Sequence, residues 1–125
     1  MVTPAEVRRL VAAIEGAVDT SDDRRLAFTA PGSDKGFAWS FNERVDPKKP
    51  RVPRLDILAV RCPMARKEFL IEVAPDRFFD DPHYRGYPAV LVRLDAVEAD
   101  ELASLLAEAA QIVAAQKPRP KRKAR

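Results

Sequence analysis

The chain has 125 residues, is 46% hydrophobic and has a formal net charge of +3, which is typical of one globular domain whose core needs no disulfide or metal. No apolar run approaches the ~20 residues of a membrane-spanning helix, and the first residues lack the order of a secretion signal, so we expect a cytoplasmic protein with no membrane partner. Cys62 is the only cysteine, which excludes an internal disulfide and a cysteine zinc cluster.

The positive charge is concentrated at the C-terminus. Residues 117–125 contain six of the 22 basic side chains and no acid, which leaves 16 basic against 19 acidic side chains, a net charge of −3, in residues 1–116. The sequence therefore predicts one mildly acidic domain over residues 1–116, followed by a basic tail over 117–125 that is disordered when free.

The first predicted element is a helix. Thr3 and Glu6 have the spacing of a capping box, and Pro4 occupies the first helical position. Apolar residues from Val7 to Ile14 repeat at helical spacing, and Gly16 favours a left-handed stop. We expect a helix of about thirteen residues.

Two alternating segments, 26–30 and 37–41, are joined by a turn rich in glycine and predict a β-hairpin. The two-residue period of a strand places Phe37, Trp39 and Phe41 on one face. We interpret these aromatic residues as part of the core rather than as a platform on which bases stack.

A basic, proline-rich segment follows at 44–54. Its three prolines cannot donate the hydrogen bonds of a sheet ladder, so we expect an extended loop or an excursion at a sheet edge. The segment carries a charge of +4 on an otherwise acidic body, and its cations are candidate phosphate contacts. These candidates are Arg44, Lys48, Lys49, Arg51 and Arg54. The alternative is a solvated loop whose cations pair with the acids of the body.

The second half of the chain alternates strand and helix patterns. We predict a strand over 55–60, a helix over 63–73, a polar-aromatic connection over 78–88, a strand over 89–94 and an amphipathic helix ending near Gln116. The four glycines form no phosphate-binding loop, so we expect no nucleotide cofactor and no other cofactor.

The polar-aromatic connection contains the candidate residues for acid–base or metal chemistry. His83 is the only histidine, and Asp80, Asp81 and Tyr84 lie beside it. Zinc sites usually take three or four ligands from rigid elements, which adjacent residues of one loop seldom supply. The alternative is that the histidine and the tyrosine are structural and pack under the loop. Cys62, at the start of a predicted helix, is either a reactive thiol or a small buried one. We favour the structural interpretation in both cases and expect no enzymatic activity.

Two blocks of the sequence resemble the MmcQ/YjbR family in its actinobacterial form. The first block comprises Gly-Phe-Ala-Trp at 36–39, Glu-Arg-Val-Asp-Pro-Lys-Lys-Pro-Arg-Val-Pro at 43–53 and Leu-Ala-Val-Arg at 58–61. The second comprises Phe-Phe at 78–79, Pro-His-Tyr at 82–84, Gly-Tyr-Pro-Ala-Val-Leu-Val-Arg-Leu at 86–94 and Asp-Glu-Leu at 100–102. The resemblance covers residues 3–116, although many relatives carry a tryptophan where this chain has Ala110.

This resemblance implies an α+β fold. An antiparallel sheet of about four to five strands would carry N-terminal, middle and C-terminal helices in a frataxin-like, double-wing arrangement. The resemblance also implies DNA binding, although a fold does not by itself fix a function.

The residues support three functional hypotheses. The leading one is a non-enzymatic module that contacts DNA phosphates, with little base readout, through the basic loop and the tail. The tail contacts would be Lys117, Arg119, Lys121 and Arg122. The second is a protein-binding or small-ligand adaptor that uses segment 78–88, and the third is a hydrolase or metal enzyme centred on His83. We expect a monomer or a weak homodimer.

Overall fold

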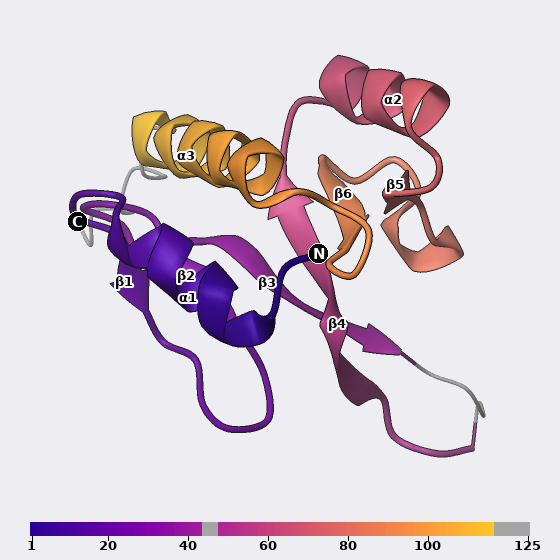
Figure 1. Ribbon diagram of the computed structural model, residues 1–125, viewed down its shortest axis with the longest axis horizontal. Helices are drawn as coiled ribbons and strands as arrows, with labels where there is room; N and C mark the ends of the chain where they lie inside the picture. Colours follow the sequence, from indigo (N-terminus) through magenta and orange to yellow (C-terminus); the bar gives the residue numbers. More distant parts are fainter. Residues whose placement is uncertain (44–47, 117–125) are drawn as a thin grey trace, which may run out of the picture.

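A computed structural model describes residues 1–43 and 48–116. Over these residues the chain forms a six-stranded antiparallel sheet, in the order β1-β2-β3-β4-β6-β5, and three α-helices (Figure 1). This confirms the predicted α+β fold. The sheet has more strands than the sequence predicts because its two edges are strands of two residues each, too short to leave an alternating pattern.

The elements follow the predicted order along the chain. The strands are β1 (Val18–Asp19), β2 (Ala27–Thr29), β3 (Gly36–Glu43), β4 (Val52–Arg61), β5 (Phe78–Phe79) and β6 (Ala89–Arg93). The helices are α1 (Pro4–Ala12), α2 (Met64–Val73) and α3 (Ala99–Ala115), with a 3₁₀ turn η1 (Pro82–Tyr84). Among the described residues, none of the helices combines the length and the apolar character needed to cross a bilayer.

Helix α1 begins as predicted and ends early. The Thr3 side chain accepts from the Glu6 backbone, and the Glu6 carboxylate accepts from the Thr3 backbone, which completes the capping box. The helix has nine residues because its last turn tightens, with the Ile14 amide donating to the Val11 carbonyl at 2.9 Å. Gly16 then takes a positive φ of 86° in the turn that leads to β1.

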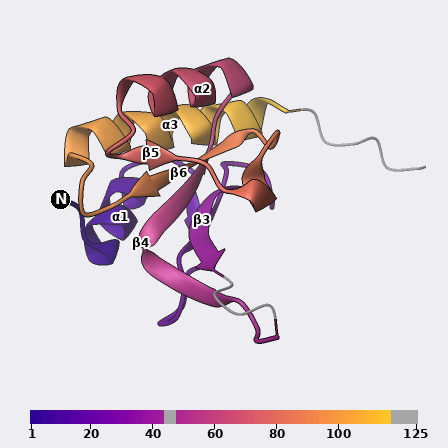
Figure 2. The ribbon, with the colours of Figure 1, turned by 90° about the vertical axis from the view of Figure 1, so that its right-hand side faces the viewer.

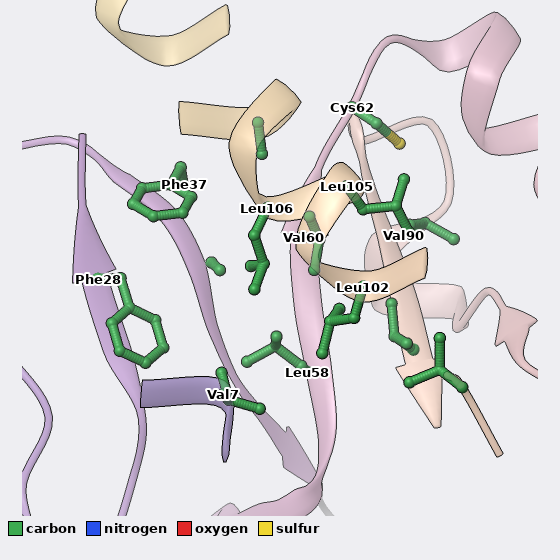
Figure 3. Close-up of a cluster of buried hydrophobic side chains, with 14 of the residues drawn as sticks. Val7, Phe28, Phe37, Leu58, Val60, Cys62, Val90, Leu102, Leu105 and Leu106 are labelled. Atoms are coloured by element: carbon green, nitrogen blue, oxygen red, sulfur yellow. The ribbon is translucent and has the colours of Figure 1, made fainter. Parts of the chain in front are cut away.

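All three helices pack on one face of the sheet and enclose the main core. Helix α3 lies across β3 and β4, α1 packs against α3 and β1, and α2 packs against β5 and β6. Figure 3 shows side chains from α1, the sheet and α3 converging between these layers. They include Val7, Phe28, Phe37, Leu58, Val60, Val90, Leu102 and Leu106. We call this the helix-covered face of the sheet.

A smaller apolar cluster lies on the opposite face. It contains Phe41, Ile57, Ala59 and Leu91 as buried residues, with Trp39, Phe79 and Tyr84 packed partly buried against them. No residue of α1, α2 or α3 belongs to this cluster within the described chain. We call this side, including the nearby Tyr87, the aromatic face.

The three aromatic residues of β3 do not share one face, which corrects the prediction from the two-residue period. The pairing of β2 with β3 shifts register between Phe28 and Thr29, which leaves Phe37 without a paired residue on β2. A bulge of this kind turns the extra side chain relative to its neighbours. Phe37 therefore packs into the core of the helix-covered face, whereas Trp39 and Phe41 pack on the aromatic face.

Candidate nucleic-acid interface

Strands β3 and β4 extend beyond the rest of the sheet as a two-stranded ribbon. Strand β6 ends at Arg93, which pairs with Ile57, and the Leu94 amide donates to the Asp56 carbonyl at 2.9 Å. Among the described residues, no strand pairs with β4 on that side beyond this point. The outer pairs of the ribbon run from Phe41↔Arg54 to Glu43↔Val52. Figures 1 and 2 show this hairpin projecting from the body, away from α2 and α3.

Three of the predicted phosphate contacts lie near the outer end of this ribbon. Lys48 and Lys49 are exposed in the segment that leads into β4, and Arg51 is exposed just before the strand begins. The Arg51 guanidinium donates from Nη1 to the neutral carbonyl of Asn42 at 3.1 Å. The structure thus brings these three cations together on one protrusion.

Arg54 forms ion pairs with two carboxylates of the ribbon. Its guanidinium contacts Glu43 on β3 at 2.8 Å and forms two hydrogen bonds with Asp56 on β4, at 2.9 and 2.7 Å. These hydrogen bonds, first those with Asp56 and then the one with Glu43, raise the pKa of Arg54 above its ordinary value. Arg54 therefore braces the two strands of the ribbon, as the alternative interpretation of the loop cations expects.

The other predicted contacts fall outside the described part of the chain. They are Arg44 in the loop and Lys117, Arg119, Lys121 and Arg122 in the tail. They stay predictions from the sequence.

Next to the ribbon, aromatic side chains from distant parts of the sequence meet on the aromatic face. The Trp39 indole Nε1 donates to the Tyr84 hydroxyl at 3.0 Å. The Tyr84 ring lies 5.8 Å from Phe41 and 5.9 Å from Tyr87, measured between ring centroids. Burial raises the pKa of Tyr84, so its hydroxyl stays protonated at neutral pH.

A buried lysine that the sequence analysis missed holds this aromatic segment in place. Lys67 of α2 has a side chain only 1% exposed, and its Nζ donates to the carbonyls of Tyr84 at 2.7 Å and Tyr87 at 2.9 Å. The same ammonium contacts the Asp80 carboxylate at 3.0 Å. The available signal was that Lys67 stands three residues after Met64 and three before Leu70, on the inward side of α2.

Three adjoining hollows cross the aromatic face. The central one, of about 230 Å³, is lined by Trp39, His83, Tyr84 and Tyr87, and we call it the aromatic hollow. A second, of about 360 Å³, shares His83 and reaches Arg51, Glu43 and Asp81. A third, of about 170 Å³, shares Trp39 and reaches Arg25.

Arginine side chains lie against the rings of this face. The Arg61 guanidinium carbon is 5.9 Å from the centroid of Trp39 and 5.2 Å from that of Tyr87, and Arg93 lies 4.1 Å from Phe79. The Arg61 Nε is buried and has no hydrogen-bond acceptor in the described part of the chain. The face therefore combines aromatic rings with positive charge.

The residues considered for acid–base or metal chemistry make structural contacts instead. The Asp81 side chain accepts from the backbone of His83 at 2.9 Å, and Asp80 pairs with Lys67. No group of three or more histidine, cysteine, aspartate or glutamate side chains suited to a metal occurs among the described residues. Cys62 is buried, which raises the pKa of its thiol to about 11, so the thiol is protonated and unreactive at neutral pH.

In sequence, part of this chain is similar to uncharacterised proteins. No family model matches it. The uncharacterised proteins Rv2570 of Mycobacterium tuberculosis and Mb2600 of Mycobacterium bovis are 45% identical to it over 58 residues, 46% of this chain. The matched segment spans 45% of each relative, so somewhat less than half of their length is covered.

A solved structure resembles nearly the whole chain. The crystal structure of Deinococcus radiodurans protein DR2400, which has a DUF419 domain, matches 96% of this chain and 84% of that one with a TM-score of 0.68. The sequence identity is 21%, so the likeness concerns the α+β fold.

Proposed function

We propose that this protein is a non-enzymatic nucleic-acid-binding module of the MmcQ/YjbR type, which contacts phosphates through the β3–β4 ribbon. The observation that carries the proposal is the gathering of the exposed Lys48, Lys49 and Arg51 on one protrusion of a domain whose net charge over residues 1–116 is −3. Because the domain has a net negative charge, a phosphate backbone can approach it only where cations gather locally, and the ribbon is one such place.

The shape of the ribbon suits this task. A two-stranded β-ribbon is narrow enough to enter the major groove of a duplex. Pro50 and Pro53 limit the conformations of its basic strand, which lowers the entropy lost on binding. Contacts to phosphates of this kind give affinity with little sequence preference and strong salt dependence.

Arg54 supports the ribbon rather than contacting phosphate in this proposal, because Glu43 and Asp56 already compensate its charge. The tail residues Lys117, Arg119, Lys121 and Arg122, together with Arg44, would add further phosphate contacts. The tail's share of the affinity is separable from that of the ribbon by truncation after Gln116.

The test is a matched pair of charge reversals. Fluorescence anisotropy of a labelled random duplex is measured with the full chain and with the chain ending at Gln116, between about 50 and 200 mM salt. Lys49→Glu should weaken binding and reduce the slope of log affinity against log salt by roughly 0.9 or more. Lys35→Glu, at the opposite end of β3, makes the same charge change on an exposed residue and should leave binding unchanged.

Two results would contradict the proposal. Equal weakening by both reversals would mean that only net charge matters, and the ribbon would have no special role. Loss of all binding on truncation after Gln116 would assign the nucleic-acid contact to the tail alone.

A further inference from the structure

We infer that the aromatic hollow holds one unpaired base of a single-stranded nucleic acid, whose backbone runs along the three hollows of the aromatic face. The inference rests on the proposed function and specifies its ligand. It predicts that the protein prefers single strands to duplexes, because a base inside a duplex is stacked and cannot enter a side pocket.

The order of residues along the hollows fits a strand. Arg25 lies at one end and Arg51 at the other, and the aromatic hollow lies between them. The aromatic hollow shares Trp39 with the hollow at Arg25 and His83 with the hollow at Arg51. Cations on either side of stacking residues are the arrangement by which proteins bind single strands without reading sequence.

The rings of the hollow are placed to receive a flat ligand. Trp39 and Tyr87 meet at 64° with centroids 6.4 Å apart, and Tyr84 and Tyr87 meet at 83°. Pairs that meet edge to face do not cover the faces of both rings, so ring surface is left to line the hollow. A base offers a planar π-surface of the matching kind.

Arg61 places positive charge beside the rings of the hollow. Its guanidinium carbon lies 5.2 Å from the ring centroid of Tyr87 and 5.9 Å from that of Trp39. Positive charge beside stacking rings favours a ligand that combines planar groups with negative charge, as a nucleic-acid strand does.

The hollow is also held rigid before any ligand arrives. Lys67 fixes the backbone of Tyr84 and Tyr87 from within, and the Trp39–Tyr84 hydrogen bond joins β3 to this segment. A site that is already ordered loses less entropy on binding, so more of the stacking energy appears as affinity.

The experiment uses Trp39 as its reporter, because it is the only tryptophan in the chain. The full-length protein is titrated with oligo(dT) of about 12 nucleotides, with a duplex of the same length and with thymidine monophosphate, following tryptophan emission and the anisotropy of a labelled strand. We expect the oligonucleotide to quench Trp39 and to bind more tightly than either the duplex or the mononucleotide.

Variants test whether stacking is responsible. Tyr87, 37% exposed at the rim, is changed to Ala, which should lower the affinity for oligo(dT) by roughly 5- to 100-fold and leave the duplex affinity unchanged. Tyr87→Phe keeps the ring and should bind like the wild type. Phe69→Ala removes an exposed aromatic from α2, away from this face, and should have no effect.

Failure of this inference differs from failure of the proposed function. If Lys49→Glu weakens binding but the duplex binds as tightly as the strand, or Tyr87→Ala changes neither affinity, the inference is wrong and the phosphate-binding ribbon stands. Equal affinity for the mononucleotide and the oligonucleotide would assign the hollow to a free nucleotide and also overturn it. Absence of binding to every nucleic acid would remove both proposals.

Discussion

The two faces of one sheet have different chemistry. On the helix-covered face, side chains such as Leu58, Val60 and Val90 are fully buried against three helices. On the aromatic face, Trp39 and Tyr84 are partly buried, use their polar atoms and line a hollow. Because neighbouring residues of a strand point to opposite faces, the same strands build the core on one side and a recognition surface on the other.

The contrast is sharpest at two adjacent residues of β5. Phe78 is fully buried in the main core, whereas Phe79 is half-buried beneath the guanidinium of Arg93. Two identical side chains thus have different roles because they point to opposite faces of the sheet: Phe78 packs in the core, and Phe79 contacts a cation at the surface. Substitutions on the helix-covered face should therefore affect the free energy of unfolding, and those on the aromatic face should affect binding.

The largest effect is expected in the main core. Phe28→Ala removes a ring that is 1% exposed and should lower the free energy of unfolding by about 3–5 kcal/mol, measured by urea denaturation. Tyr87→Ala, on the aromatic face, should change it by less than about 1 kcal/mol. Similar losses of unfolding free energy for the two variants would mean that both faces contribute equally to stability, contrary to the distinction between them.

Lys67 connects the two faces, and its removal should affect both. Lys67→Met keeps the aliphatic stem but leaves the Tyr84 and Tyr87 carbonyls without their donor, which should cost about 2–3 kcal/mol. The aromatic segment should also loosen, which would shift the emission of Trp39. Arg66→Met, next to it on the exposed side of α2, is the control and should change neither measurement. A stable Lys67→Met variant with unchanged emission would show that packing alone fixes the segment.

Much of the helix-covered face could be predicted from the sequence. Local signals specify it: the capping box at Thr3 and the apolar spacing of α3 each act within a few residues. The early end of α1 and the turned Phe37 could not be predicted from period alone. Both depend on backbone changes, a tightened turn and a bulge, that leave the residue pattern unchanged.

The candidate site was less predictable because its contacts are not local. The sequence drew attention to Tyr84 and Tyr87, but their neighbour Trp39 is 45 positions from Tyr84. Arg54 carries the same charge as Lys49 in the sequence, yet two carboxylates compensate it, one of them across the ribbon. Periodicity and charge identify the participants, and tertiary structure decides which of them is available to a ligand.

A smaller effect is expected from the hydrogen bond that closes the aromatic face. Tyr84→Phe keeps the ring against Phe41 and deletes the acceptor of the Trp39 indole, so the free energy of unfolding should fall by about 0.5–1.5 kcal/mol. Phe41→Leu tests packing in the same cluster while keeping this hydrogen bond. If Tyr84→Phe were neutral while its Trp39 emission matched the wild type, solvent would be replacing the hydroxyl.

The smallest effect on stability is expected from the ion pairs of Arg54 with Glu43 and Asp56 in the ribbon, and it depends on pH. Asp56 has a pKa below its ordinary value of 3.8, first because Arg54 donates hydrogen bonds to it. A depressed pKa in the folded state gives stability that is present above the unfolded pKa and is lost as the pH falls through the folded pKa. Because the Asp56 side chain is 52% exposed and screened by solvent, Asp56→Asn should cost only about 0.2–1 kcal/mol at neutral pH.

This difference between the wild type and Asp56→Asn should shrink below about pH 4, where the wild-type carboxylate also becomes neutral, and it should shrink at high salt. Urea denaturation at several pH values measures it, with the exposed Asp34→Asn, in the turn between β2 and β3, as the control. Parallel stability curves for the wild type and Asp56→Asn across the acid range would mean that the ion pair contributes nothing. In that case the carboxylates would not hold Arg54 in place, and Arg54 would have to be counted with Lys49 and Arg51 among the residues that contact phosphate.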